Sequence, residues 1–409
     1  MRTYLFLQGP HGPFFRRLGL ELADQGHKVV RVNMCGGDVV DWPSPWARSY
    51  RGRSVDWGKW IARLMDEEAV TDLLVFGDWR PPHREAVLLA RLRGVRVWAF
   101  EEGYVRPDYI TMEADGVNGH SSLPRTPEGL RAVLDAFGPA RPSVPVLNPL
   151  SARMKLAVRY AVGQAFLWPW FPLFRTHRPR NVWVESAGWA RRMLGESGRR
   201  RTSMEVIRRV YNSRCPYFLF PLQLDSDSQV RRYSPFSGMK EAVAYVLASF
   251  ARSAPGHVHL VIRNHPLDNG LIDYRRFIAG FSAAAGVEDR VHFVETGNAR
   301  LMLDKSEGVV VLNSTIGLSA LRRGRPVYCV GTSVYAMPGL AASPARQALD
   351  AFWSAPGPPD LAVLDDFIEV LKRRALVNGA FYTDEGMETA IRGVLDRLEG
   401  AAVPVGGAA

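Results

Sequence analysis

The sequence predicts an α/β protein made of two doubly wound, Rossmann-like domains that face a cleft. Short apolar runs alternate with helical stretches over about the first 145 residues, and the same alternation resumes near residue 206. Strand, loop and helix repeated in this order build a parallel sheet with helices on both faces. The chain has 409 residues, which is long for a single core, so two domains are expected.

In the first half, apolar runs of strand length are separated by segments of helix length. The predicted strands are TYLFLQG (3–9), HKVVRVNM (27–34), TDLLVFGD (71–78) and VRVWAFEEG (95–103), and the predicted helices are 13–26 and 83–94. In a sheet of this kind, functional residues are expected in the loops that follow the carboxyl ends of the strands.

The middle of the chain, residues 146–205, breaks the alternation. It is irregular in pattern and combines aromatics, prolines and a basic cluster. The stretch LWPWFPLFRTHRPR (167–180) has two readings. It is a surface that seats aromatics and arginines at a lipid headgroup layer, or an interdomain linker with a buried aromatic cluster.

The second half returns to the α/β pattern. The predicted strands are 216–223, 257–266, 291–297, 308–315 and 326–331, the predicted helices are 238–256 and 316–324, and a last helix near 385–399 precedes a loose tail. Two such halves describe a GT-B-like architecture with its site in the cleft. The boundaries follow as 1–145, 146–205, 206–380 and 381–409.

The composition limits the cellular compartments and the binding partners that are expected. There are 52 basic and 41 acidic residues, a net charge of +11, which favours anionic partners: nucleic acid, an anionic membrane or an anionic substrate. No nucleic-acid-binding signature accompanies this charge, so no nucleic acid partner is expected. Three scattered cysteines suit a reducing cytosol. Neither a signal peptide nor a transmembrane helix is expected.

Two strand ends carry groups that can move protons or meet an anion. Glu101 and Glu102 leave the strand 95–103 together, so at least one faces the cleft and could exchange a proton with an acceptor hydroxyl; the alternative is an ordinary solvated loop. His265, between Asn264 and Pro266, is placed to contact a phosphate or to be a packed histidine, and Arg263 beside it favours an anion site.

A third strand end could bind phosphate without a metal. The apolar strand before Asn313 runs into Ser314, Thr315 and then a helix. Hydroxyls and backbone amides at a helix N-terminus form a phosphate cradle. The alternative is a plain Ser/Thr N-cap, which is common to many helices.

The stretch PLQLDSDSQV (221–230) holds two carboxylates, Asp225 and Asp227, two residues apart. In an extended segment they point the same way and could share one divalent metal. Alternatively, one of them is a nucleophile in a retaining glycosyl transfer that passes through a covalent intermediate. The spacing alone leaves both readings open.

Together these stretches resemble the capsule polysaccharide biosynthesis family, in particular its KpsS/LipB-type retaining β-Kdo transferases. The matching pieces, in the order of the family, are LFLQGPHGPFFRRL at the start, EEGYVRPDYIT (101–111), PLQLDSDSQV, the dipeptide His265-Pro266 and NSTIGLSALRRGRPV (313–327). The resemblance covers both halves, whereas the middle segment and the extreme C-terminus match less.

The resemblance implies transfer of β-Kdo from CMP-Kdo, with retention, to a (lyso)phosphatidylglycerol acceptor that starts a capsular poly-Kdo linker. It implies Asp227 as nucleophile, Glu101 or Glu102 as acid/base and His265 as the group that assists CMP departure; the role of Asp225 stays open. The donor-binding residues that it implies are Ser314, Thr315, Asn313, Arg263, Gln223, Gly9 and His11.

Because CMP-Kdo carries a single phosphate, no metal and no other cofactor are expected. The resemblance implies an acceptor-side N-terminal domain and a CMP-sugar-binding domain at 206–380. It also implies a cytoplasmic protein, peripheral on the inner face of the inner membrane, with an anionic membrane surface and other capsule biosynthesis and export proteins as partners.

Three other functions compete with this interpretation. The first is a GT-B enzyme with another donor, including a sialyltransferase-like user of a different CMP-sugar. The second is a non-catalytic, membrane-peripheral capsule assembly factor. The third, a dinucleotide-dependent oxidoreductase, is disfavoured because neither half has G-x-G-x-x-G after its first strand, and GPHG (9–12) is not that pattern.

Overall fold

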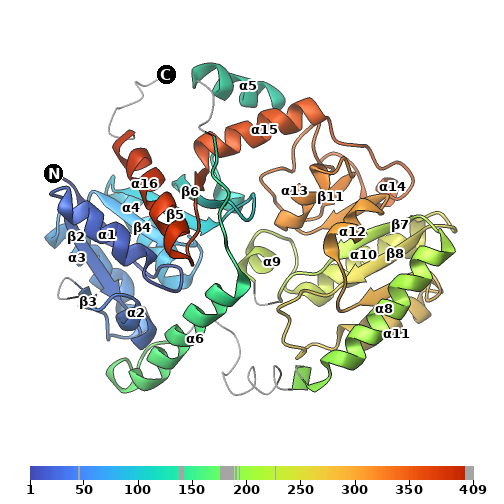
Figure 1. Ribbon diagram of the computed structural model, residues 1–409, viewed down its shortest axis with the longest axis horizontal. Coiled ribbons are helices and arrows are strands. Elements are labelled where there is room, and N and C mark those ends of the chain that lie inside the picture. Colours follow the sequence, from blue (N-terminus) through green and yellow to red (C-terminus); the bar gives the residue numbers. More distant parts are fainter. Residues whose placement is uncertain are drawn as a thin grey trace. The chain divides into compact units, whose positions relative to one another are not determined.

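The chain divides into two compact α/β units in the computed structural model, which describes residues 1–44, 47–137, 142–175, 188, 191–192, 194–225 and 227–400 (Figure 1). The first unit comprises the described residues of Met1–Leu123, Gly138–His177 and Val370–Ala409. The second comprises those of Pro124–Phe137 and Arg178–Glu369. Each unit holds a sheet with parallel strands, which confirms the predicted α/β class.

The sheet of the first unit has seven strands in the order β12-β6-β5-β4-β1-β2-β3. Neighbours from β5 to β3 pair in parallel, whereas β6 pairs antiparallel with both β5 and β12. The bounds are β1 Thr3–Phe6, β2 Lys28–Asn33, β3 Ala47–Ser49, β4 Asp72–Phe76, β5 Arg96–Glu102, β6 Tyr109–Ala114 and β12 Leu376–Asn378.

Helices cover both faces of this first sheet. They are α1 Phe14–Asp24, α2 Gly36–Asp41, α3 Trp57–Glu67, α4 Pro81–Leu92, α6 Leu150–Phe166 and α16 Asp384–Gly400, with short 3-10 turns η1 Ser54–Asp56, η2 Asn118–His120 and η3 Trp168–Trp170. One core packs Phe14, Phe100 and Ile391 under α1 and α16, which lie side by side (Figure 1). The other core packs Val97 and Ile61 under α3 and α4.

The second unit is built on a five-stranded parallel sheet in the order β11-β10-β7-β8-β9. Its strands are β7 Tyr217–Pro221, β8 His259–Arg263, β9 Val291–Val294, β10 Gly308–Val311 and β11 Val327–Cys329. Its helices are α5 Pro127–Ala136, α8 Glu196–Ser213, α9 Ser228–Arg232, α10 Met239–Ser253, α11 Tyr274–Ala284, α12 Ala299–Asp304, α13 Thr315–Leu321 and α14 Leu349–Phe352, and α15 Leu361–Arg374 continues into the first unit.

In both sheets, the order in which successive strands are added reverses once, at a central strand. In the first unit β1 lies between β2 and β4, and in the second unit β7 lies between β8 and β10. Successive strands are added first on one side of the central strand and then on the other. The carboxyl ends of the strands at such a switch point form the crevice where α/β sheets bind ligands.

The middle segment is more regular than its sequence pattern indicates. It contains α6 and α8, two long helices in a region expected to be irregular. The periodicity of α6 is hidden because both of its faces are apolar: Leu156 and Tyr160 pack on the first unit, while Met154 and Val158 are exposed. Residues 176–180 of the predicted lipid-facing stretch lie outside the described residues.

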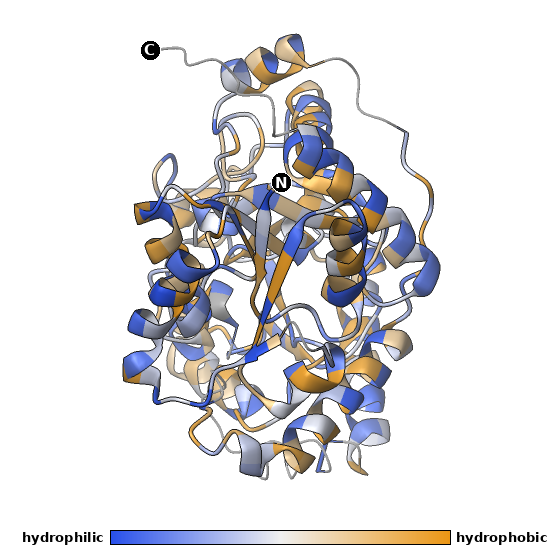
Figure 2. Cartoon of the chain, turned by 90° about the vertical axis from the view of Figure 1, so that its left-hand side faces the viewer, coloured by the Kyte–Doolittle hydropathy of each residue, from blue (hydrophilic) through white to orange (hydrophobic). Residues whose placement is uncertain are grey.

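Helices such as α1 and α3 bury one apolar face and expose a polar one. Figure 2 shows hydrophilic and hydrophobic positions alternating along the helices that face the viewer, as expected for helices with one buried side. In the described part of the chain, no helix combines the length and the hydropathy needed to cross a bilayer.

Candidate active site

The two carboxylates after β7 accept hydrogen bonds at the starts of two different helices. Asp227 is the N-cap of α9, and its Oδ1 accepts a hydrogen bond of 2.9 Å from the N–H of Gln229. Asp225 accepts a bond of 2.9 Å from the N–H of Met239 at the start of α10 and pairs with Arg231 at 3.2 Å. Both sites satisfy orphan N–H groups, which is the usual role of Asp before a helix.

An amide pair holds the helix that Asp227 caps. The Gln223 side chain donates to Asn313 Oδ1 at 3.0 Å, and the Asn313 amide donates to the carbonyls of Gln229 at 2.8 Å and Tyr233 at 3.2 Å. Both amides are buried. Gln223 and Asn313 therefore link the carboxyl ends of β7 and β10, the two strands that flank the switch point, and position α9 and Asp227.

Ser314 and Thr315 begin the helix after β10. Ser314 is the N-cap of α13, and its hydroxyl accepts from the N–H of Ile316 at 3.4 Å. Thr315 is the first residue of the helix, and both side chains are half-buried. The hydroxyls lie at the same sheet edge as Asp227, because β7 and β10 are parallel neighbours.

His265 and Arg263 follow β8 at that edge. His265 Nδ1 accepts the N–H of Leu267 at 3.1 Å, and this bond assigns the proton of a neutral ring to Nε2. Arg263 donates to the carbonyl of Gly297 at 3.4 Å, and burial lowers the pKa of its guanidinium. Arg263 Nε and Thr296 Oγ1 are buried and find no hydrogen-bond partner among the described residues, so they remain available to an anionic ligand.

A cluster of arginines that the sequence analysis missed lies close to His265. Arg192, Arg199 and Arg275 all pair with the buried Glu295, at 3.5, 3.1 and 3.2 Å. They line a cavity of about 130 Å³ that Asn264, the residue before His265, also lines. Arg192 also pairs with Asp268 at 3.4 Å, so three guanidinium groups meet two carboxylates and leave positive charge beside the carboxyl end of β8.

The two glutamates of the first unit lie on opposite faces of β5. Glu102 accepts from the hydroxyl of Tyr382 at 2.6 Å and pairs with Arg153 at 3.1 Å. Burial, and then the Glu102 charge, raise the pKa of Tyr382 well above its ordinary value, which keeps it a donor. Glu101 lies beside the carboxyl end of β4, because a side chain added at Gly77, the residue after β4, would lie 3.7 Å from Glu101 Oε2.

The Gly9–Gly12 loop covers a buried polar network. The ring of His11 lies edge-on to that of Tyr160 at 4.3 Å, and the Tyr160 hydroxyl donates to Asp38 at 3.0 Å. Asp38 also accepts from the Gln8 amide at 3.1 Å. A side chain at Gly9 would meet the ring of Phe15 at 2.8 Å, so this position requires glycine. The network fixes the loop, and sequence spacing gave no sign of it.

The predicted residues thus fall into two groups. Asp227, Gln223, Asn313, Ser314, Thr315, Arg263 and His265 share the carboxyl edge of the second sheet, and Gly9, His11, Glu101 and Glu102 share that of the first. Within the described residues, no three His, Cys, Asp or Glu side chains gather as a metal site would require.

Comparison with known proteins agrees with the resemblance in the motifs. The family model "Capsule polysaccharide biosynthesis protein" matches residues 71–382. The Capsule polysaccharide export protein KpsS of Escherichia coli is 33% identical over 93% of this chain and 97% of its own length. The Capsule polysaccharide modification protein LipB of Neisseria meningitidis serogroup A is 31% identical over 93% and 91%.

Among solved structures, the beta Kdo 2,7 transferase KpsC of Thermosulfurimonas dismutans covers 97% of this chain and 100% of its own. Its TM-score of 0.44 and identity of 15% are too low to carry a conclusion on activity. The family model and the two curated relatives span most of the chain and establish the family without it. The chain belongs to the capsule polysaccharide biosynthesis family.

Proposed function

We propose that the chain is a retaining glycosyltransferase that moves β-Kdo from CMP-Kdo to a (lyso)phosphatidylglycerol acceptor. The observation that carries the proposal is the Asp227 carboxylate, held beside the switch point of the second sheet by the Gln223–Asn313 pair. Membership of a family that contains KpsS and LipB supports a role in capsule assembly. The positive groups along the same edge suit an anionic donor with one phosphate.

In the first step, an Asp227 oxygen attacks the anomeric carbon of Kdo, and the bond from that carbon to the CMP phosphate oxygen breaks. The leaving CMP carries negative charge. Arg263, Ser314 and the Nε2 proton of His265 are the groups that meet it, without a metal or other cofactor. The product is a Kdo ester on Asp227 with inverted configuration.

In the second step, Glu101 or Glu102 takes the proton of the acceptor hydroxyl. The acceptor oxygen bonds to the anomeric carbon as the ester bond to Asp227 breaks, and the carboxylate is regenerated. Two inversions give net retention. Such proton transfer by a positioned carboxylate increases the reaction rate by a factor of about 10²–10⁴.

The exposed face of α6 supports a peripheral membrane location for this enzyme. Leu150, Met154, Val158, Val162 and Phe166 recur every four residues along the helix, and each is at least 49% exposed. Trp168 and Trp170 of η3 continue the exposed apolar surface. Residues 142–175 contain no Asp or Glu, so the charges that flank this face are positive, which suits the anionic cytoplasmic leaflet.

The test is to incubate the whole protein with CMP-Kdo and no acceptor, digest it and locate the adduct by mass spectrometry. A Kdo ester on Asp227, lost on addition of lysophosphatidylglycerol, is the expected result, and EDTA should leave it unchanged. An adduct on Asp225, or turnover with a UDP-sugar alone, would contradict the proposal. Absence of any turnover, with capsule formation intact in an Asp227→Ala strain, would favour the assembly-factor alternative.

A further inference from the structure

A large apolar cavity of the first unit is left unused by the proposed chemistry. Its volume is about 630 Å³, within the roughly 300–1,000 Å³ of small-molecule sites. Its walls come from the carboxyl ends of β2, β3 and β4, from α3 and α4, and from the segment after η3. Met34, Trp57, Trp79, Val87, Leu88 and Phe174 supply its apolar surface.

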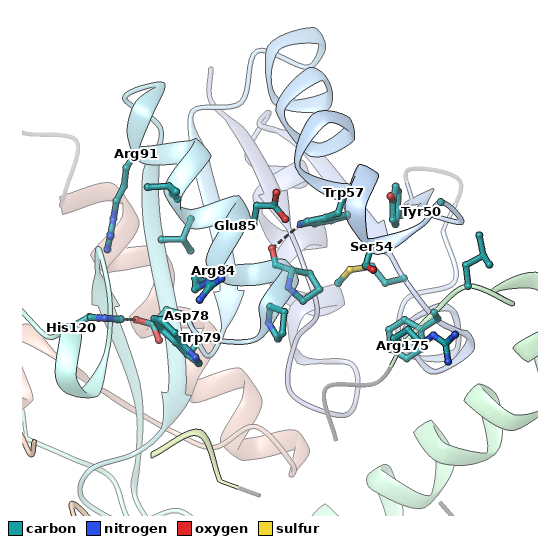
Figure 3. Close-up of a pocket in the computed structure, with 18 residues that line it drawn as sticks. Tyr50, Ser54, Trp57, Asp78, Trp79, Arg84, Glu85, Arg91, His120 and Arg175 are labelled. Carbon is teal, nitrogen blue, oxygen red and sulfur yellow. Dashed lines mark hydrogen bonds and ion pairs between the residues drawn. The ribbon is translucent and has the colours of Figure 1, made fainter. Parts of the chain in front are cut away.

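Cationic groups are spread along the lining. Figure 3 shows Arg91 and His120 at one end of the pocket, Arg84 beside Trp79, and Arg175 at the other end. The Arg84 guanidinium lies over the Trp79 ring at 5.1 Å. The lining holds three arginines and two acids, and one of the acids, Asp78, lies 2.9 Å from His120 and accepts from a backbone N–H. The pocket is therefore apolar in its walls and positive in net charge.

The pocket lies on the same face of the sheet as Glu101. Side chains alternate along a strand, so Val97, Ala99 and Glu101 share one face of β5. Val97 and Ala99 belong to the core under α3 and α4, which also includes Met34 and Trp57 of the pocket. Glu102 is directed to the other face, where it meets Tyr382.

The segment that forms one wall continues the exposed apolar surface of η3. Leu173 and Phe174 line the pocket, and Leu173 is 46% exposed. The neighbouring Trp170 is exposed as well. Exposed apolar side chains therefore lie within three residues of the pocket wall along the chain, where an amphiphile at a lipid surface could enter.

We propose that this pocket takes the acyl chain of one anionic single-chain phospholipid and that its arginines meet the phosphate. The inference rests on the proposed function only in identifying this lipid with the acceptor. A single cavity of about 630 Å³, in the range of sites for one small molecule, suits one acyl chain. With the chain in the pocket, Glu101 is the carboxylate on the face that carries the lipid, which makes it the acid/base for the acceptor hydroxyl.

The test is direct binding without any donor. Lysophosphatidylglycerols brominated on the acyl chain are titrated below their micelle concentration, and quenching of tryptophan fluorescence gives the Kd. Shortening the chain by two methylenes should weaken binding about fifteenfold, because each buried CH₂ contributes about 0.8 kcal/mol. A Kd that is independent of chain length would overturn the proposal.

Two matched variants on α4 place the binding. Leu88 lines the pocket and is 56% exposed, whereas Leu92, one turn later, is 74% exposed and outside the lining. Both tolerate a charge without loss of core packing. Leu88→Glu should weaken binding at least tenfold and Leu92→Glu less than twofold; equal effects of the two variants would contradict the pocket.

The headgroup is tested with Arg84→Gln, with the exposed Lys59→Gln as control, and with an uncharged monoacylglycerol of the same chain length. The Arg84→Gln protein should bind the lysolipid at least tenfold more weakly, and the wild-type protein should bind the uncharged lipid at least tenfold more weakly. Undiminished binding in either experiment would refute an anionic ligand.

The two proposals fail separately. Binding of the lysolipid without any Kdo transfer would contradict the proposed function alone. If the Leu88→Glu variant still transfers Kdo to the lipid at the normal rate, the pocket proposal alone is contradicted.

Discussion

The two units share the order of their central strands but use the carboxyl edge of the sheet differently. At the edge of the first sheet, the residues around Asp38 form a closed network under the Gly9–Gly12 loop, and an apolar cavity opens beside it. At the edge of the second, short helices begin after Asp227 and Ser314, and the buried Nε of Arg263 has no hydrogen-bond partner among the described residues. The same order of central strands thus borders an apolar cavity in one unit and a row of polar side chains at helix starts in the other.

The difference shows that the strand order fixes where a site lies and the loops decide what it binds. The loop after β7 ends at the N-cap of α9, which leaves the Asp227 carboxylate at the edge. The loop after β4 carries Trp79, and α4 begins with two prolines, which leaves aromatic and aliphatic walls. The predictions below separate the contributions of the two edges.

The largest effect is expected at Asp227, because a nucleophile cannot be replaced by a neighbouring group. Asp227→Asn should lower kcat by at least about a thousandfold while leaving Tm unchanged, since Asn caps a helix as well as Asp does. Transfer assays with CMP-Kdo and thermal unfolding measure the two. Retained activity would reduce Asp227 to a helix cap. Asp225→Asn is the matched control and should keep transfer.

The second-largest effect tests which face of the first sheet carries the acid/base. Glu101→Gln should reduce kcat about a hundredfold or more, because it removes the acid/base on the face that carries the pocket. Glu102→Gln should cost less activity, because its carboxylate is committed to Tyr382 and Arg153. Steady-state kinetics with a lysolipid acceptor compare them. A larger loss in Glu102→Gln would place the acceptor on the opposite face.

A smaller effect tests the anion site of the second unit. Arg263→Gln should raise the KM for CMP-Kdo by about ten- to a hundredfold, the value of a hydrogen bond to a charged group of about 1.5–3 kcal/mol. The exposed Arg276→Gln changes net charge equally and should leave KM unchanged. If both variants raise KM alike, overall charge rather than a built site attracts the donor.

The smallest effect lies at the amino end of the second sheet, away from the site. Burial, and then the charges of His259 and Arg209, lower the pKa of His292 from 6.5 to about 4. Because the unfolded state then binds the extra proton, stability is full above about pH 6.5 and falls toward pH 4. The expected loss between pH 7 and pH 5 is about 1 kcal/mol after allowance for solvent screening. His292→Gln should flatten this dependence without altering transfer, as urea unfolding would report.

The central strands could be predicted because they are apolar runs between turn residues, and so could the strand ends at which the candidate side chains lie. Two antiparallel strands were missed. β12 has only three residues, and β6 follows β5 too closely for a helical crossover. The contacts inside the site were beyond sequence reasoning, because Gln223 and Asn313 are 90 positions apart and Arg192, Arg199 and Arg275 meet only through Glu295.

The first unit is completed by a segment that is synthesised after the whole of the second unit. Strand β12 pairs with the edge of β6, and α16 covers the core that holds Phe14 and Phe100. During translation, the sheet of the first unit therefore has an unpaired edge and an uncovered face until the second unit has been synthesised. A chain truncated before β12 should therefore yield insoluble protein, because this edge and this face of the first unit stay exposed.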